Sequence, residues 1–317
     1  MHEALVNEAV SLIIQNKVKN RKIVVLKIRN SNQRLRAAFQ REEKFGFEVC
    51  YEDKELLATL AQKSVLYYVV IDGKYTEDID GLMRRYGYEE MKDFLFCVPK
   101  EIVLQGRTSK YQDERGNCIE NLPSNIKISL TGYGSKIYFG EKVLFGRESS
   151  MRIGSFANIR CATNSRFGER TQIELLDGGS IIIEKITFGG SSGGRAIIAC
   201  GEKGRMKIGK ESSYGTDNEL IANAYHTLEI GEDVMTSRHV AIRSGDGHGI
   251  FDVISAKKKN FLIDESDEWR RLVIGNHVWI GYEGMIIGPS NIGSGCIVAA
   301  KSLLKGKYPN NCLIGGE

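Results

Sequence analysis

The chain has 317 residues and a formal net charge of +4, from 44 lysines and arginines against 40 aspartates and glutamates. Hydrophobic residues make up 42% and charged residues 26%, which are ordinary globular proportions that exclude extended disorder. The nearly balanced charge argues against a nucleic-acid partner, and a length above that of one small domain indicates two structural units.

The seven cysteines occur singly, without the Cys-x-x-Cys pairs that indicate zinc or redox sites. Residues 1–20 have the pattern of an amphipathic helix and lack the apolar core of a signal peptide. No apolar run reaches the roughly 18 residues that span a membrane. We therefore expect a cytoplasmic protein with reduced thiols, without a metal site and without a membrane span.

Residues 1–120 alternate strand-like and helix-like segments, which predicts a small Rossmann-like α/β domain with a parallel sheet. The expected strands and helices are, in order, strand 22–28, helix 32–46, strand 47–51, strand 65–72, helix 78–88 and strand 93–99. The turn after the first strand contains no glycine, so its backbone cannot closely approach a pyrophosphate, and dinucleotide binding is disfavoured. Docking, regulation or oligomerisation is the more reasonable role for this domain.

The composition changes after residue 120, where the turn-rich segment Asn121–Asn125 marks a domain boundary. Most of the 35 glycines follow it, and helical periodicity disappears. Short aliphatic segments such as "MRIG" and "TLEIG" end in glycine. Residues 121–317 therefore form a second domain whose chain turns often.

Aliphatic residues recur at every sixth position between Val273 and Gly306, a period that fits neither a helix nor a flat strand. The series consists of Ile274, Ile280, Ile286, Ile292, Val298 and Leu304. Compact residues follow four positions later, at Val278, Gly284, Ser290, Cys296 and Ser302. A solenoid of short strands explains the pattern, with three faces per coil and a shared core. The same phase returns upstream at Ile230, Thr236 and Ile242.

The segment "IGNHVWIGYEGMIIGPSNIGSGCIVAAKSLLKGKYPNNCLIGG" resembles the hexapeptide-repeat acyltransferases with a left-handed parallel β-helix. The upstream "IRSGDGHGIFD" resembles the branch of that family that O-acetylates capsular or lipopolysaccharide sugars. The resemblance implies acetyl-CoA as cosubstrate, a carbohydrate acceptor and a homotrimer with active sites between neighbouring subunits.

The family's catalytic histidine falls on His248, which lies at the start of a long departure from the six-residue phase that ends only at Ile274. Loops of this length in a compact domain are usually functional. Histidine is a suitable general base because its unperturbed pKa is about 6.5. Asp246 is expected either to orient the imidazole or to cap the glycine-rich turn. By similarity, Glu219 in the preceding coil holds the imidazole or the acceptor sugar, or is a solvated turn acid.

The phase places Trp279 at a coil edge, where a large exposed aromatic residue needs a covering group. The resemblance implies that this covering group is the thioester end of acetyl-CoA, and the alternative is packing of the ring against the long loop. His277 is expected to point outward on the same edge, with ligand contact and plain exposure equally favoured.

The resemblance also places Gly281 and Ala299 where backbone groups meet the pantetheine arm. Lys301 and Lys305 match basic positions near the phosphates of CoA, although exposed lysines are common on solenoids.

We interpret the chain as an acetyl-CoA-dependent sugar O-acetyltransferase that transfers the acetyl group directly. The alternatives are an N-acetyltransferase of an amino nucleotide-sugar and a non-catalytic structural solenoid. A zinc carbonic anhydrase on this solenoid is disfavoured because the close histidine pair is missing, and a nucleotidyltransferase because the phosphate loop is missing.

Overall fold

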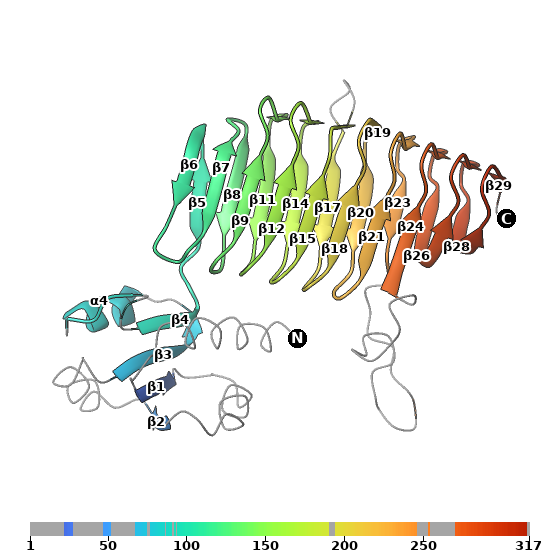
Figure 1. Cartoon of the computed structure of the whole chain (residues 1–317). Helices are drawn as coiled ribbons and strands as arrows, with labels where there is room; N and C mark the ends of the chain where they lie inside the picture. Colours follow the sequence, from blue (N-terminus) through green and yellow to red (C-terminus); the bar gives the residue numbers. More distant parts are fainter. Residues whose placement is uncertain are drawn as a thin grey trace. The chain divides into compact units, whose positions relative to one another are not determined.

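The computed structural model describes residues 22–27, 47–51, 67–74, 77–85, 87–90, 92, 94–189, 194–245, 253 and 270–315. The chain divides into two compact units (Figure 1). The first comprises Met1–Ile102 with Thr131–Tyr133, and the second Val103–Leu130 with Gly134–Glu317. The division expected at residue 120 stays a prediction.

The first unit contains a four-stranded parallel sheet in the order β2-β1-β3-β4 and, before β4, the helix α4. The bounds are β1 Lys22–Lys27, β2 Phe47–Tyr51, β3 Tyr67–Lys74, α4 Glu77–Arg85 and β4 Phe94–Val98. These five elements coincide with segments that the sequence predicts in the same states. The helices expected over residues 1–20 and 32–46 lie outside the described residues, so the complete α/β layer stays a prediction.

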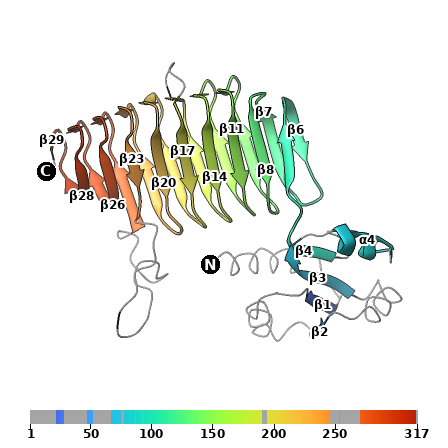
Figure 2. The same cartoon turned by 180° about the vertical axis from the view of Figure 1, so that it is seen from behind.

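The second unit is a parallel β-solenoid whose strands stack coil upon coil on three faces (Figures 1 and 2). It opens with β5 Ile102–Gln105, β6 Thr108–Gln112 and β7 Cys118–Leu122, of which β6 and β7 pair antiparallel. The first face contains β8 Ile126–Leu130, β11 Ser149–Ile153, β14 Thr171–Leu175, β17 Ala196–Cys200, β20 Asn218–Ala222 and β23 Ala241–Arg243.

Each coil continues from the first face to a second and then a third. The second face contains β9 Lys136–Phe139, β12 Asn158–Cys161, β15 Ser180–Ile183, β18 Arg205–Ile208, β21 Thr227–Ile230 and β24 Arg271–Ile274. The third contains β10 Leu144–Phe145, β13 Arg166–Phe167, β16 Ile186–Phe188, β19 Ser212–Tyr214, β22 Met235–Thr236, β25 Trp279–Ile280, β27 Ile297–Val298 and β29 Leu313–Ile314. The long strands β26 Met285–Ile292 and β28 Leu303–Tyr308 run across the first two faces.

The core of the solenoid consists of inward side chains that stack in register from coil to coil. On the third face Phe145 and Phe167 stack with ring centroids 4.5 Å apart, and Phe188 and Tyr214 stack at 4.8 Å. Aliphatic residues replace these rings in the coils after Thr236. All six aliphatic positions of the period-six series are buried, as are Ile230, Thr236 and Ile242. The solenoid and its inward phase are therefore confirmed.

The corners between faces are formed by residues in the left-handed backbone region. Most of these are not glycine: His239 has a φ of 57°, His277 of 55° and Lys301 of 59°. Asn, Asp and His tolerate this region better than other residues with a Cβ, which accounts for Asn164, Asp217 and the two histidines at corners.

Within the described residues, no helix is long and apolar enough to cross a membrane. The same residues contain no group of three or more His, Cys, Asp or Glu side chains that could hold a metal ion.

Candidate functional site

The long departure from the repeat begins at the corner between the first and second faces. β23 precedes it and pairs with β20 and β26, while β24 follows it and pairs with β21 and β26. The coil therefore keeps its register on both sides of the insertion. His248 and Asp246, the predicted catalytic residues, belong to this segment and lie outside the described residues.

Glu219, the predicted substrate-binding carboxylate, lies on β20 and faces outward from the first face. The Arg243 guanidinium on neighbouring β23 donates a hydrogen bond from Nη2 to its Oε2. Arg243 directly precedes Ser244, where the chain turns toward the insertion. The ion pair therefore places a charged, partly exposed group at the point from which the predicted catalytic segment departs.

A partly buried polar group, which we term the root cluster, lies at the same corner and consists of Asn223, His226, Ser244 and Gly245, of which His226 and Ser244 are buried. The Asn223 backbone N–H donates to Ser244 Oγ at 2.8 Å. Gly245 lies directly against the imidazole, because a Cβ built on it would be 3.3 Å from His226 Nε2. The root cluster ties the start of the insertion to the coil before it.

His226 has a defined tautomer within this cluster. Its Nδ1 lies 2.8 Å from the Ala224 carbonyl oxygen, which can only accept, so Nδ1 carries the proton. In the neutral ring Nε2 is then an acceptor, and it faces Gly245. The roles of His226, Asn223 and Arg243 were not expected from the sequence. The sequence did contain a signal for His226. Leu220 and Ile242 pair in register on adjacent coils, and His226 and His248 are separated by the same number of residues along the chain.

Trp279 is half exposed on β25 of the third face. It lies in register between Met235 on β22 and Ile297 on β27, and Ile297 pairs in turn with Leu313 on β29. All four side chains are exposed. We term this row the apolar ladder, and it places the predicted acyl-donor tryptophan within a continuous apolar strip.

Gly281 and Ala299 follow β25 and β27 in adjacent coils, beside the apolar ladder. The Gly281 N–H donates to the Val298 carbonyl and the Ala299 N–H to the Ile314 carbonyl, each at 2.8 Å. Both N–H groups are thus used within the solenoid, and the Gly281 carbonyl oxygen accepts from the Gly284 N–H at 3.1 Å, so a ligand here would meet carbonyl oxygens through their remaining lone pairs. A Cβ on Gly281 would lie 2.7 Å from the Ala300 nitrogen, so the coils approach closely.

The remaining predicted residues flank the third face. His277 is exposed at the corner before β25, with Nδ1 2.7 Å from Asp233 Oδ2. Lys301 is exposed at the corner after β27, with Nζ 3.9 Å from Glu283 Oε2. Lys305 is exposed on β28 and forms no ion pair with another described residue.

The predicted site residues therefore fall into two groups within one chain. Glu219 lies near the start of β20 on the first face, and its carboxylate reaches Arg243, which is beside the corner from which the His248 segment departs. Trp279 lies on the third face, which is opposite that corner in a three-sided coil, and Gly281 and Ala299 lie at the corners that lead from the third face to the first. One chain does not bring the two groups together through its described residues.

No family model matches the chain. A polysialic acid O-acetyltransferase of Escherichia coli is 32% identical over 77 residues, covering 24% of this chain and 22% of that protein. A probable acetyltransferase of Mycobacterium tuberculosis is 25% identical over 114 residues, covering 36% of this chain and 35% of that protein. The matches thus span well under half the length of these relatives.

The crystal structure of the polysialic acid-specific acetyltransferase NeuO superposes with a TM-score of 0.50 at 20% identity, covering 61% of this chain and 83% of that one. This likeness concerns the fold alone. The resemblance to hexapeptide-repeat acyltransferases is confirmed. The chain is a parallel β-solenoid related to proteins that are named acetyltransferases.

Proposed function

We propose that the chain is an acetyl-CoA-dependent O-acetyltransferase acting on a sugar hydroxyl of a surface polysaccharide or of its precursor. The observation that carries the proposal is the kinship with acetyltransferases, one of which is named for polysialic acid. The position of the insertion adds support, because the chain departs toward His248 directly after Arg243, which forms an ion pair with Glu219.

In the proposed reaction, His248 removes the proton from the acceptor hydroxyl as its oxygen attacks the thioester carbonyl carbon. The carbon–sulfur bond breaks, the acetyl group stays on the sugar oxygen, and the CoA thiolate leaves and takes up a proton. Asp246 orients the imidazole, and Glu219, paired with Arg243, holds acceptor or imidazole. Histidine fits the base role because it exchanges protons close to neutral pH.

For the acyl donor, Trp279 would cover the thioester end, and carbonyl groups of Gly281 and Ala299 would contact the pantetheine amides. Lys301 and Lys305 would face the phosphates, and His277 would contact ligand beside Trp279. The exposure of Trp279 and of both lysines supports this placement, since each is open to a ligand.

We further propose a left-handed winding and a homotrimer, in which the third face of one subunit meets the His248 corner of its neighbour. The separation of the two residue groups within one chain supports this arrangement, because a second copy can complete the site. The free thiols of Cys118, Cys161, Cys200, Cys296 and Cys312 favour a cytoplasmic location.

The test is release of free thiol from acetyl-CoA by the purified full-length protein, with acidic and neutral surface glycans as acceptors. His248→Ala is expected to lower kcat by about 10²–10⁴-fold. His239→Ala is the matched control, because His239 lies at an exposed corner against Tyr282, at 5.6 Å between ring centroids, and should retain activity. Absence of turnover with every acceptor, or full activity of His248→Ala, would refute the proposal.

A further inference from the structure

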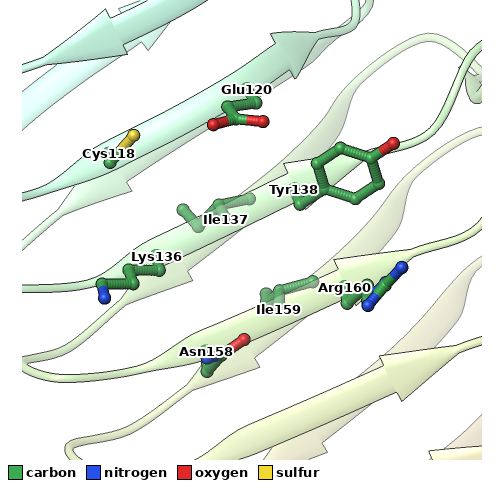
Figure 3. Close-up of a pocket in the computed structure, with 8 residues that line it drawn as sticks. All are labelled: Cys118, Glu120, Lys136, Ile137, Tyr138, Asn158, Ile159 and Arg160. Carbon is green, nitrogen blue, oxygen red and sulfur yellow. The ribbon is translucent and has the colours of Figure 1, made fainter.

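The second face of the solenoid has a groove in its first coils, far along the chain from the candidate site. Its outward lining consists of Cys118 and Glu120 on β7, Lys136 and Tyr138 on β9, and Asn158 and Arg160 on β12 (Figure 3). The groove has a volume of about 600 Å³. We term it the N-terminal groove.

The groove presents an aromatic ring between opposite charges. Glu120 pairs in register with Tyr138, and Tyr138 with Arg160, so the three side chains form one row across adjacent strands (Figure 3). The Arg160 guanidinium lies 5.7 Å from the centroid of the Tyr138 ring, within cation–π distance. Tyr138 nevertheless remains 39% exposed, which leaves part of its surface open to a ligand.

Positive charge continues from the groove along the second face. Ile182, which is 42% exposed, follows Arg160 in the row, and Lys207 follows Ile182. In the parallel row, Lys136 leads through Asn158 and Ser180 to Arg205. With adjacent strands about 4.8 Å apart, each row sets its two cations about 10–15 Å apart.

These cations are available to a ligand. None of Lys136, Arg160, Arg205 and Lys207 forms an ion pair with another residue that the structure describes, and all four are exposed. Between Cys118 and Lys207, the described strands of this face carry one outward acidic residue, Glu120. The strip is therefore basic, although the whole chain is nearly neutral.

We propose that the N-terminal groove and the basic strip behind it bind an acidic polysaccharide, as a docking surface separate from the acetyl-transfer site. Lys136 and Arg160 would pair with carboxylates of the glycan. Glu120 and Asn158 would accept or donate hydrogen bonds with sugar hydroxyls, and Tyr138 and Ile182 would pack against the apolar faces of the rings. The proposal deepens the proposed function and rests on it, because it makes the acceptor a polyanion held at two places.

An acidic glycan fits these residues better than a nucleic acid does. A nucleic acid carries a phosphate on every nucleotide, so a strip for it requires dense cations and avoids carboxylates. Here the cations are spaced by Asn158, Ser180 and Ile182, and Glu120 lies inside the groove. Mixed charges with neutral polar groups suit a polymer that offers both carboxylates and hydroxyls.

The first test is direct binding of long-chain polysialic acid to the full-length protein by calorimetry, with dextran as the neutral polymer and oligo-dT as the other polyanion. Lys136→Glu and Arg160→Glu are each expected to weaken polysialic acid binding about tenfold or more, since each removes a charge-assisted hydrogen bond to a glycan carboxylate and adds a like charge. Arg166→Glu on the third face is the charge-matched control and should bind like the wild type. Rising salt should weaken the wild-type interaction.

The second test separates this inference from the proposed function by comparing acetylation of long polysialic acid with that of its trimer. Groove variants are expected to raise KM for the long polymer and to leave turnover of the trimer unchanged. No turnover by the wild type on either acceptor, together with none on the other acidic and neutral surface glycans, contradicts the proposed function. Normal KM in the groove variants, an equal effect of Arg166→Glu, or equal affinity for oligo-dT overturns the docking surface.

Discussion

Glu202 is a buried acid whose environment disfavours its charge. Burial raises the pKa of this carboxyl above its ordinary value, and the negative charge of Asp177 adds to that rise. A hydrogen bond from the Tyr225 hydroxyl and the positive charge of Lys203 act in the opposite direction but do not cancel it. The folded protein therefore holds this proton at pH values where the unfolded chain has released it.

This shift predicts a pH dependence of stability. Because the folded state binds the proton more tightly, the contribution of Glu202 to stability falls as pH rises above the ordinary carboxyl pKa. Glu202→Gln keeps an acceptor for the Tyr225 hydroxyl and removes the charge. At pH 7 we expect the variant to have a higher melting temperature than the wild type. Near pH 4 we expect the two melting temperatures to be equal. Thermal unfolding at both pH values measures this, and exposed Glu174→Gln should show no such pattern.

At the scale of one coil, the glycine that follows an inward isoleucine lies so close to the backbone of the next coil that a Cβ would clash with it. A Cβ on Gly209 would lie 2.4 Å from the Gly231 carbonyl oxygen, and one on Gly231 would lie 2.7 Å from Gly275 backbone atoms. None of these three glycines has a positive φ. Tight stacking, rather than turn conformation, therefore explains their place in the repeat.

Gly209→Ala is expected to destabilise the protein by about 1–3 kcal/mol, the usual cost of overpacking a rigid interior. Gly315→Ala is the control, because nothing lies within 4 Å of a Cβ built there. Urea unfolding followed by circular dichroism compares the midpoints of the two variants. An unchanged midpoint for Gly209→Ala would show that adjacent coils can separate without cost.

The sequence predicts these coils well because one residue type recurs at one position in each coil. The period of six predicted the inward residues of the strands from β24 to β28, and burial confirms them. The many glycines suggest that glycine forms the tight turns between faces, but those turns also use residues such as His239 and Asn164 in the left-handed region. The period is harder to see in the upstream coils because each of them has extra residues at the corner between the first and second faces, as at Asn223–His226.

The candidate site was less predictable than the coils. Trp279 lies on a regular strand and is exposed outside the aliphatic core, as the phase predicts, while its role and that of Glu219 stay predictions. The partner Arg243 and the root cluster were missed, because contacts between coils depend on register across a corner and not on local spacing. His248 and Asp246 stay predictions.

At the scale of the whole molecule, the third face changes character along the solenoid. Its outward row reads Leu144, Arg166, Thr187 and Ser213 in the early coils and then becomes the apolar ladder of Met235, Trp279, Ile297 and Leu313. Strands about 4.8 Å apart make the ladder a continuous strip. Exposed continuous apolar strips of this kind mark interaction sites, and here the strip coincides with the face proposed to meet a neighbouring subunit.

Ile297→Glu is therefore expected to shift the protein from trimer to monomer, because it places a charge in the middle of the strip. Leu144→Glu is the matched control, since Leu144 is also exposed on the third face but lies outside the apolar ladder. Light scattering coupled to gel filtration measures the mass of each variant. A monomeric wild type, or equal dissociation by Leu144→Glu, would contradict assembly through the apolar ladder, and acetyl transfer would then have to be completed within one chain.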